Sequence, residues 1–365
     1  MTPDAAFEAL GGDLVDPPFI LDAAVPLELS GEAVRGRLCV FQDSEGREFA
    51  LRPDITLPIA VAEADIRAKC AIGETVRRYN AKAFRLPGEA DAEAHEFTQI
   101  GAELFGFPKS IEIDLRVFEA TLHAAHRAGA TAACATLGDL GVFPAFVDAL
   151  DAPPAAADAL KRAFREPGGV AAILDRSATD NTESLGAQIS RLGKSDAEAM
   201  VRDVFALSGI DLVGGRSVSE ITERLRDRAA LAWRPDQRAQ DVMAEVLALN
   251  VAAGEAADAL AFMARRTALD GLDDVFGALA ERHNRIEALD TPVDLDARFG
   301  TAFGRRFNYY DGFLFELSSP SGEASRAFAS GGRYDGLLTR LSAGAADATA
   351  VGGMVRPARI VEAQA

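Results

Sequence analysis

The chain has few of the residues from which metal centres and disulfide frameworks are built. It contains three cysteines, an odd number, and they lie far apart at Cys39, Cys70 and Cys134. Their spacing matches no metal motif and no disulfide framework, which fits a reducing cytosol. The four histidines form no HExxH pattern, and His123 and His126, three apart in an expected helix, are more typical of a surface pair than of a zinc site. We expect neither a metal nor a cofactor.

Basic residues are also in deficit. Lysine and arginine number 38 against 56 acidic residues, which gives a formal net charge of −18 at pH 7. A field of that sign repels polyanions, so sequence-independent binding of nucleic acid is not expected. No apolar run is long enough to span a membrane, and residues 1–13 lack the basic and apolar segments of a signal peptide. We therefore expect a cytoplasmic protein with neither a membrane nor a nucleic-acid partner.

Apolar residues, in contrast, are plentiful. They make up 48% of the 365 residues, and this length indicates more than one domain or a core with a large insertion. Residues 1–138 and 290–365 combine short strands, hairpins and helices, which predicts an α+β core domain built on an antiparallel sheet. Alanine-rich helical periodicity dominates residues 139–289, which we expect to form a helical insertion.

Turn residues and periodicity divide the chain into expected elements. Residues 38–42 and 48–52 predict a hairpin across the turn DSEGR, and residues 57–71 predict a helix with Thr56 as its N-cap. Capping alone would explain Asp54 and Thr56 as well as a binding role would. Further strands are expected within 84–106, on either side of a loop, and at 131–136, 293–298, 313–317, 326–329 and 349–355. Helices are expected at 111–128, 155–164, 196–207, 218–230, 241–249 and 272–288.

The most informative stretch is the alternating run that ends at residue 105. One face of this expected strand carries Phe97, Gln99, Gly101, Glu103 and Phe105. A Gln and a Glu between phenylalanines are unusual for a strand that only fills a core, because buried polar groups need partners. Either water or a small polar ligand supplies those partners, and Gly101 would leave room for a ligand against the backbone.

Four motifs occur in the order in which one known family has them. They are LRPDIT at 51–56, FR and FTQIGAELFG within 84–106, RRFNYYDGFLFEL at 305–317, and ASGGRYDGLL at 329–338. Together they resemble the histidyl-tRNA synthetase family, with the expected helical insertion between the second motif and the third. The resemblance implies the catalytic-type domain of class II aminoacyl-tRNA synthetases, an antiparallel sheet flanked by helices.

The resemblance also implies a binding site for histidine. The implied histidine-binding residues are Asp54, Thr56, Arg85, Gln99, Glu103, Arg305, Tyr309, Tyr310 and Tyr334. A carboxylate can pair with an α-ammonium group, and an acceptor such as Glu103 or a tyrosine hydroxyl can fix an imidazole N–H. Asp54 stands where the family usually has glutamate. Arg305 stands at the family's catalytic arginine, but Arg306 replaces the glycine beside it.

The loop between the two strands departs from the family. The active pattern is roughly FR-x-E-RPQ-x-GR-x-R-x-F, whereas this chain reads FRLPGEADAEAHEF. That loop ordinarily grips the ATP phosphates and the tRNA end, and acidic residues here oppose both polyanions. The acidic residues are Glu89, Asp91, Glu93 and Glu96. We therefore expect no catalytic residues, and the loop can equally be described as a solvated acidic surface.

An implied histidine site beside an altered ATP- and tRNA-binding loop resembles one subfamily, the regulatory subunits of ATP phosphoribosyltransferase. These proteins share the RPD-x-T form of the second motif. The resemblance implies a self-dimerising, non-catalytic partner of the short-form catalytic subunit, in a hetero-octamer of four and four. It also implies that the partner needs this chain for activity and for histidine feedback inhibition in the first step of L-histidine biosynthesis. Two alternatives remain open: a synthetase paralogue that forms histidyl-adenylate through Arg85, Arg305 and Arg359, and a scaffold in which Asp54, Gln99 and Glu103 form only a satisfied core network.

Overall fold

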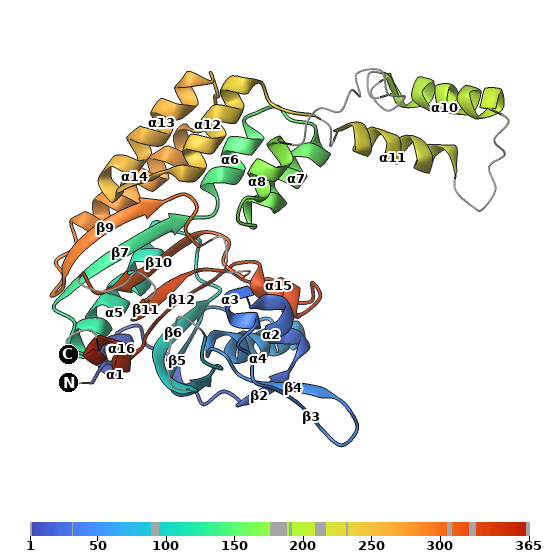
Figure 1. Cartoon of the computed structure of the whole chain (residues 1–365). Coiled ribbons are helices and arrows are strands. Elements are labelled where there is room, and N and C mark those ends of the chain that lie inside the picture. The colour runs from blue at the N-terminus through green and yellow to red at the C-terminus, as the bar shows by residue number, and fades with distance from the viewer. Residues whose placement is uncertain are drawn as a thin grey trace. The chain divides into compact units, whose positions relative to one another are not determined.

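The chain divides into two units (Figure 1). Unit 1 comprises Met1–Val142, Val246–Phe262 and Asp273–Ala365, and unit 2 comprises Phe143–Glu245 and Met263–Leu272. The computed structural model describes residues 2–30, 32–88, 95–175, 188–189, 192–208, 217–230, 233–304, 309–320 and 326–362. The domain limits expected from the sequence, at 138/139 and 289/290, stay a prediction.

The framework of unit 1 is a nine-stranded sheet (Figure 1). Its strands, in order across the sheet, are β1 (Asp13–Leu14), β5 (Thr75–Phe84), β6 (Glu96–Phe105), β12 (Ala350–Val355), β11 (Ala329–Arg333), β10 (Phe313–Ser318), β7 (Ala132–Asp139), β9 (Asp294–Gly300) and β8 (Asn250–Ala252). The pairs β1–β5 and β7–β9 are parallel, so the sheet is mixed and not antiparallel throughout. A parallel pair needs a long crossover, and the chain between β7 and β9 supplies one.

The alternating stretch that ends at residue 105 forms one side of a long hairpin. β6 pairs with β5 from Glu96–Phe84 to Phe105–Thr75, and on its other edge with β12. β6 is therefore paired along both edges, and every residue from Gln99 to Phe105 is buried. The strands expected at 313–317 and 349–355 are confirmed as β10 and β12.

The strand expected at 326–329 was placed too early. β11 begins at Ala329 and runs through Gly331 and Gly332 to Arg333, although glycines favour turns. The glycines are needed because neighbouring strands leave no space for side chains. A Cβ at Gly331 would lie 2.5 Å from the carbonyl oxygen of Gly352. Gly-Gly-Arg is therefore part of the sheet and not a turn.

The described helices of unit 1 surround this sheet. They are α1 (Asp4–Glu8), α2 (Ala24–Leu29), α3 (Glu32–Arg35), α4 (Thr56–Lys69), α5 (Ile111–Arg127), α14 (Asp273–Glu287), α15 (Leu337–Leu341) and α16 (Pro357–Glu362). α5 begins at the N-cap Ser110, whose hydroxyl accepts from Ile113 N at 3.3 Å. It packs on β11 and β12, and Phe118 meets Phe315 edge-on at 4.8 Å between ring centroids.

The predicted cap of α4 was wrong. Thr56 is the first residue of the helix, and Ile55 occupies the N-cap position without a side-chain bond. Asp54 takes over the capping bond, because its Oδ1 accepts from Leu57 N at 2.9 Å. The Thr56 hydroxyl points elsewhere and donates to Glu103 at 2.6 Å. At the start of α4, Asp54 therefore caps the helix, whereas the side chain of Thr56 is bonded to a residue of β6.

A smaller sheet precedes α4. Its strands are β2 (Ile20–Asp22), β4 (Glu48–Leu51) and β3 (Val40–Gln42), in that order and antiparallel. The predicted hairpin is therefore confirmed as β3 and β4. Its turn is built on Asp43, whose Oδ1 accepts from the backbone N–H groups of Glu45 and Arg47.

The regular elements described in unit 2 are all helices. Its helices are α7 (Pro154–Phe164), α8 (Gly169–Leu174), α10 (Lys194–Ser208) and α11 (Val218–Ala230), while α6 (Val142–Asp148), α12 (Gln237–Ala248) and α13 (Ala256–Arg266) each include residues of both units. The rings of Phe143 and Phe164 stack at 4.7 Å. The helices expected from periodicity in this region are confirmed in type and position. Within the described ranges, every helix is too short or too polar to cross a membrane.

Candidate functional site

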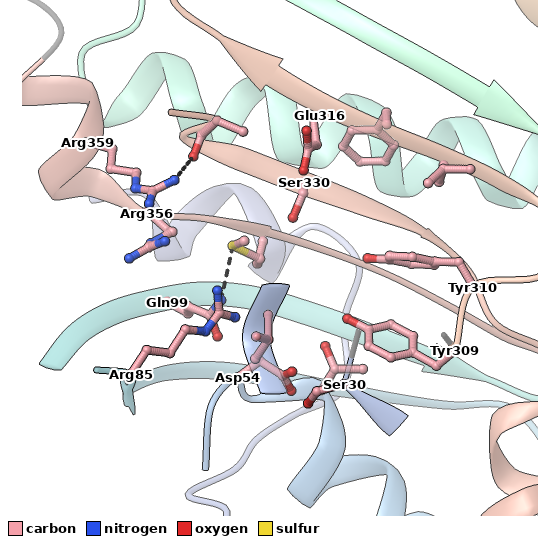
Figure 2. Close-up of a pocket in the computed structure, with 16 residues that line it drawn as sticks. Ser30, Asp54, Arg85, Gln99, Tyr309, Tyr310, Glu316, Ser330, Arg356 and Arg359 are labelled. Atoms are coloured by element: carbon pink, nitrogen blue, oxygen red, sulfur yellow. Dashed lines mark hydrogen bonds between the residues drawn. The ribbon is translucent and has the colours of Figure 1, made fainter. Parts of the chain in front are cut away.

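A polar cavity lies within unit 1, on one face of the nine-stranded sheet (Figure 2). Strand register brings its floor together, because Glu316 of β10 pairs with Ser330 of β11, and Ser330 pairs with Met354 of β12. These side chains therefore lie side by side on the same face. The cavity measures about 120 Å³. Its polar lining residues are Ser30, Asp54, Thr56, Arg85, Gln99, Tyr309, Tyr310, Glu316, Ser330, Arg356 and Arg359.

Asp54 and Arg85 form a charged pair near the start of α4. Asp54 is 8% exposed, and burial raises the pKa of its carboxyl although the Leu57 N–H and the charge of Arg85 oppose that rise. Arg85 follows β5 and is anchored by its Nε, which donates to the carbonyl oxygen of Pro53 at 2.7 Å. Burial lowers the pKa of this guanidinium, and Asp54 counteracts the effect. The pair offers the cavity one carboxylate and one cation.

Gln99 is held rigidly beside this pair. Its Oε1 accepts from Ile55 N at 3.1 Å, and its Nε2 donates to the Met354 sulfur at 3.6 Å. Thioether sulfur is a weak acceptor, so the Gln99 amide retains capacity to donate to a bound molecule. Gln99 is 3% exposed, and it reaches the cavity from the buried face of β6.

Glu103 lies beneath the cavity lining. Its carboxylate accepts hydrogen bonds from the hydroxyls of Thr56, at 2.6 Å, Tyr79, at 3.1 Å, and Tyr334. Glu103 is 1% exposed, and burial raises its pKa to about 7 although the three hydroxyls oppose that rise. The carboxylate is thus a satisfied acceptor that holds three side chains in place, and Thr56 alone among them reaches the cavity.

Glycines make room for this network. A Cβ on Gly352 would lie 1.6 Å from Glu103 Oε2. The expected role of Gly101 was wrong, because a Cβ there would lie 2.6 Å from the hydroxyl of Tyr79. The space above Gly101 is therefore occupied by a tyrosine side chain of the neighbouring strand, which leaves no room for a ligand against that backbone.

The four tyrosines of the chain all belong to this region. Tyr309 and Tyr310, just before β10, line the cavity with their rings 4.7 Å apart. Tyr334 packs edge-on against both, at 5.9 and 6.2 Å, and lies behind them at 1% exposure. Burial raises the pKa of each of these three phenols, so they remain protonated hydrogen-bond donors at neutral pH.

The structure brings most of the predicted site residues together. Six line the cavity: Asp54, Thr56, Arg85, Gln99, Tyr309 and Tyr310. Glu103 and Tyr334 support the lining from behind. Arg305 and its neighbour Arg306 lie outside the described residues, as do residues 89–94 of the acidic loop. Binding of histidine by any of these residues stays a prediction.

Several lining residues were missed from the sequence, among them Ser30, Glu316, Ser330 and Arg356. Glu316 could have been found, because a lone carboxylate in the apolar run FLFEL demands an explanation. Burial raises its pKa to about 7, and the charge of Arg359 opposes that rise. Arg356 had no local signal, since its place depends on the pairing of β12 with β6.

The lining suits a small zwitterion. Acidic carboxyl groups and basic guanidinium groups face one small space, and tyrosine rings close one side of it (Figure 2). Among the residues that the structure describes, no cluster of three His, Cys, Asp or Glu side chains could hold a metal ion. The mixed sheet with its covering helices and this cavity defines a class II synthetase-type domain with a site of amino-acid size.

Comparison with known proteins places the chain more narrowly. A family model described as histidyl-tRNA synthetase matches residues 4–360. The ATP phosphoribosyltransferase regulatory subunit of Sinorhizobium fredii is 31% identical over 350 residues, covering 93% of this chain and 89% of that protein. The subunit of the same name from Agrobacterium fabrum is 32% identical over 348 residues, covering 92% and 89%. The chain belongs to the histidyl-tRNA synthetase family and, within it, to the ATP phosphoribosyltransferase regulatory subunits.

Solved structures support the fold. A Bacillus halodurans protein titled ATP phosphoribosyltransferase regulatory subunit/histidyl-tRNA synthetase superposes with a TM-score of 0.59 at 19% identity, covering 99% of this chain and 76% of its own. Histidyl-tRNA synthetase from Nostoc sp. PCC 7120 superposes with a TM-score of 0.58 at 15% identity, covering 99% and 69%. The fold class and the family predicted from the four motifs are confirmed.

Proposed function

We propose that this chain is the non-catalytic regulatory subunit of an ATP phosphoribosyltransferase, and that L-histidine binds in the cavity of unit 1. The observation that carries the proposal is the match to curated regulatory subunits over nine-tenths of the chain, together with a retained cavity of mixed charge. Its partner is a short-form catalytic subunit, which depends on this chain for activity and for feedback inhibition in the first step of L-histidine biosynthesis.

The lining supports histidine as the ligand. Asp54 offers a buried carboxylate to the α-ammonium group, and Arg85 offers a guanidinium to the α-carboxylate. Tyr309 and Tyr310 can both donate to and accept from the two imidazole nitrogens. A site that matches every polar group of one ligand rejects amino acids that lack them, because its own groups would remain unpaired.

One feature of the sequence supports a regulatory and not a catalytic role. The loop that would grip ATP phosphates carries Glu89, Asp91 and Glu93 in this sequence. Carboxylates there repel phosphates where a synthetase needs attraction. We further propose assembly in the cytoplasm as a hetero-octamer of four regulatory and four catalytic chains, in which the regulatory chains dimerise.

Isothermal titration of the full chain with L-histidine, alone and mixed with a short-form catalytic subunit, tests the proposal. We expect binding in at least one of the two, and activation of the catalytic subunit by the chain. Asp54→Asn should weaken histidine binding by about 10- to 100-fold, since a hydrogen bond to a charged group contributes about 1.5–3 kcal/mol. Asp13→Asn is the matched control, because Asp13 is an exposed carboxylate paired with Arg77 in the same unit.

Two outcomes would refute the proposed regulatory role, and a third would refute the proposed histidine site. The first is a chain that neither binds histidine nor activates the partner. The second is histidine-dependent ATP–pyrophosphate exchange by the purified chain that Arg85→Ala abolishes, which would identify a synthetase paralogue. Unchanged feedback inhibition in Asp54→Asn would indicate that the cavity is only a structural relic.

A further inference from the structure

Three arginines gather at one end of the cavity. Arg85, Arg356 and Arg359 lie together, opposite Tyr309 and Tyr310 (Figure 2). Two of them have fixed anchors: Arg85 Nε donates to Pro53 O, and Arg359 Nη1 donates to Ala327 O, each at 2.7 Å. Guanidinium groups bind phosphates, and an aromatic ring beside them would hold a planar base by stacking. The end of the cavity therefore has the components of a nucleotide site.

The aromatic ring at this end is covered. Phe97 lies on β6, two residues before Gln99 and on the same face, yet it is 6% exposed and does not line the cavity. The guanidinium carbon of Arg356 lies 3.7 Å from the centroid of its ring, and that of Arg85 lies 5.3 Å from it. A separation of 3.7 Å is a stacking contact, so the planar group on Phe97 belongs to the protein itself.

The fold holds Arg356 in this position. Arg356 stands between β12, which ends at Val355, and α16, which begins at Pro357. Its backbone N–H donates to the carbonyl oxygen of Phe328 at 2.7 Å, and the following proline restricts it to an extended conformation. Alternation along the strand places its side chain on the same face as Met354, toward the cavity. Arg356 is 4% exposed, so it is a buried residue of the cavity wall and not a surface arginine.

We propose that Arg356 determines the specificity of this cavity by occupying the face of Phe97 on which a nucleobase would stack. Its guanidinium keeps purine nucleosides and nucleotides out, and it leaves the tyrosine end open to an amino acid. This role goes beyond the proposed histidine binding. It depends on the geometry of Arg356 and Phe97, and not on which amino acid the other end takes.

The test is titration of the full chain with adenosine, in which no phosphate contributes. The wild type should show no adenosine binding at millimolar concentration. Arg356→Ala should gain adenosine affinity by about 5- to 150-fold over the wild-type limit, the range expected for one base on an aromatic ring. Adding Phe97→Leu to Arg356→Ala should remove the gain, because the base would lose its stacking surface.

Two control variants test whether the effect of Arg356 comes from covering the Phe97 ring. One removes the charge of Arg356 but keeps a long side chain, and the other removes a different arginine. Arg356→Met removes the charge but keeps an unbranched chain over the ring, so it should not gain adenosine binding. Arg116→Ala removes a guanidinium that lies 5.8 Å from the Phe107 ring, outside the cavity, and should behave as the wild type. Equal gain in Arg356→Met and Arg356→Ala, or no gain in a folded Arg356→Ala chain, overturns the proposal.

The wild-type chain also tests the proposal without any variant. Adenosine that displaces bound histidine from the wild type overturns the proposal, and failure of adenosine to bind there supports it even if Arg356→Ala does not fold. The two proposals fail separately. Absence of histidine binding to the wild type defeats the proposed ligand, whereas the adenosine comparison between wild type and Arg356→Ala still decides the role of Arg356.

Discussion

At the scale of single residues, the protonation of Glu103 should affect the stability of the fold. Its pKa rises from 4.5 to about 7 on folding, because burial outweighs three hydroxyl donors. Between these two pH values the folded chain binds a proton that the unfolded chain has released. Stability from this group is therefore complete below pH 4.5 and falls as the pH rises toward 7, by roughly 3 kcal/mol in total.

Glu103→Gln should remove this dependence. We expect the variant to become more stable relative to the wild type as the pH rises from 4.5 to 7, by roughly the same 3 kcal/mol. Urea unfolding at a series of pH values measures the difference. His283, whose pKa burial lowers to about 4, changes stability in the opposite direction but cancels because both chains contain it. A flat difference across this range would contradict the assignment.

At the scale of elements, β12 depends on a glycine for its fit to β6. Gly352→Ala would place a Cβ 1.6 Å from Glu103 Oε2, so the carboxylate must leave its three hydroxyl donors or the strands must part. We expect a loss of at least about 2 kcal/mol in the free energy of unfolding, measured by urea denaturation. An unchanged midpoint would show that Glu103 is not held where the structure has it.

The matched control is a glycine with open space. Gly277 is exposed in α14, and a Cβ there would meet nothing within 4 Å. Gly277→Ala should therefore stabilise the chain by about 0.5–1 kcal/mol, because alanine loses less backbone entropy in a helix. The opposite signs expected for two Gly→Ala changes separate strand crowding from a general effect of the substitution.

The attachment of α14 to α5 rests on a buried ion network. Asp114 of α5 accepts from Arg333 of β11 at 2.8 Å and from Arg282 of α14 at 3.3 Å, with side-chain exposures of 3%, 2% and 11%. Asp114→Asn leaves the two arginines short of one negative charge, and we expect a loss of about 3–5 kcal/mol in unfolding free energy.

A second pair between the same two helices is the control for this prediction. Glu112 of α5 accepts from Arg285 of α14 at 2.6 Å, but their side chains are 65% and 41% exposed. Glu112→Gln should change the unfolding free energy by less than about 1 kcal/mol, as solvent-exposed pairs do. Similar losses in both variants, measured by urea denaturation, would mean that burial does not govern this contact.

Local patterns predicted the elements well and their partners poorly. The pattern on β6 correctly predicted that Gln99 and Glu103 are buried polar residues. The expectation that water or a ligand supplies their partners was wrong for Glu103, whose carboxylate accepts from three protein hydroxyls. The network around Glu103 was not visible, since Tyr334 lies 231 residues away and reaches it only through the order of strands in the sheet. Arg356 was missed for the same reason. The capping role predicted for Thr56 was wrong because its hydroxyl donates to Glu103 of β6 and does not bond to the backbone at the start of the helix.

At the scale of the whole molecule, the four sequence motifs predicted the fold and the family because they come from separate parts of one unit. LRPDIT, FTQIGAELFG, FLFEL and ASGGRYDGLL reach α4, β6, β10 and β11, and they contribute Asp54, Gln99, Glu316 and Ser330 to the lining of the cavity. Unit 1 thus contains the described site without a contribution from unit 2. Regulation by a ligand in this cavity must therefore begin from a change within unit 1.

If histidine inhibits the assembly, it must bind the inhibited state more tightly than the active state, because a ligand with equal affinity for both shifts nothing. If ATP and the phosphoribosyl donor bind the active state of the catalytic subunit more tightly, saturating that subunit with them favours the active state. We therefore expect these substrates to weaken histidine binding to the regulatory chain by about 5- to 150-fold, the range of typical coupling energies. Titration of the complex with histidine, with and without the substrates, measures this factor.

The control is the regulatory chain alone, on which the same substrates should leave histidine affinity unchanged. This follows from the covered ring of Phe97, which should exclude ATP from the cavity. Weaker histidine binding in the isolated chain would instead indicate direct competition at the arginine end of the cavity. An affinity that is the same with and without substrates in the complex would separate histidine binding from inhibition, and the inhibitory signal would then have to arise outside this cavity.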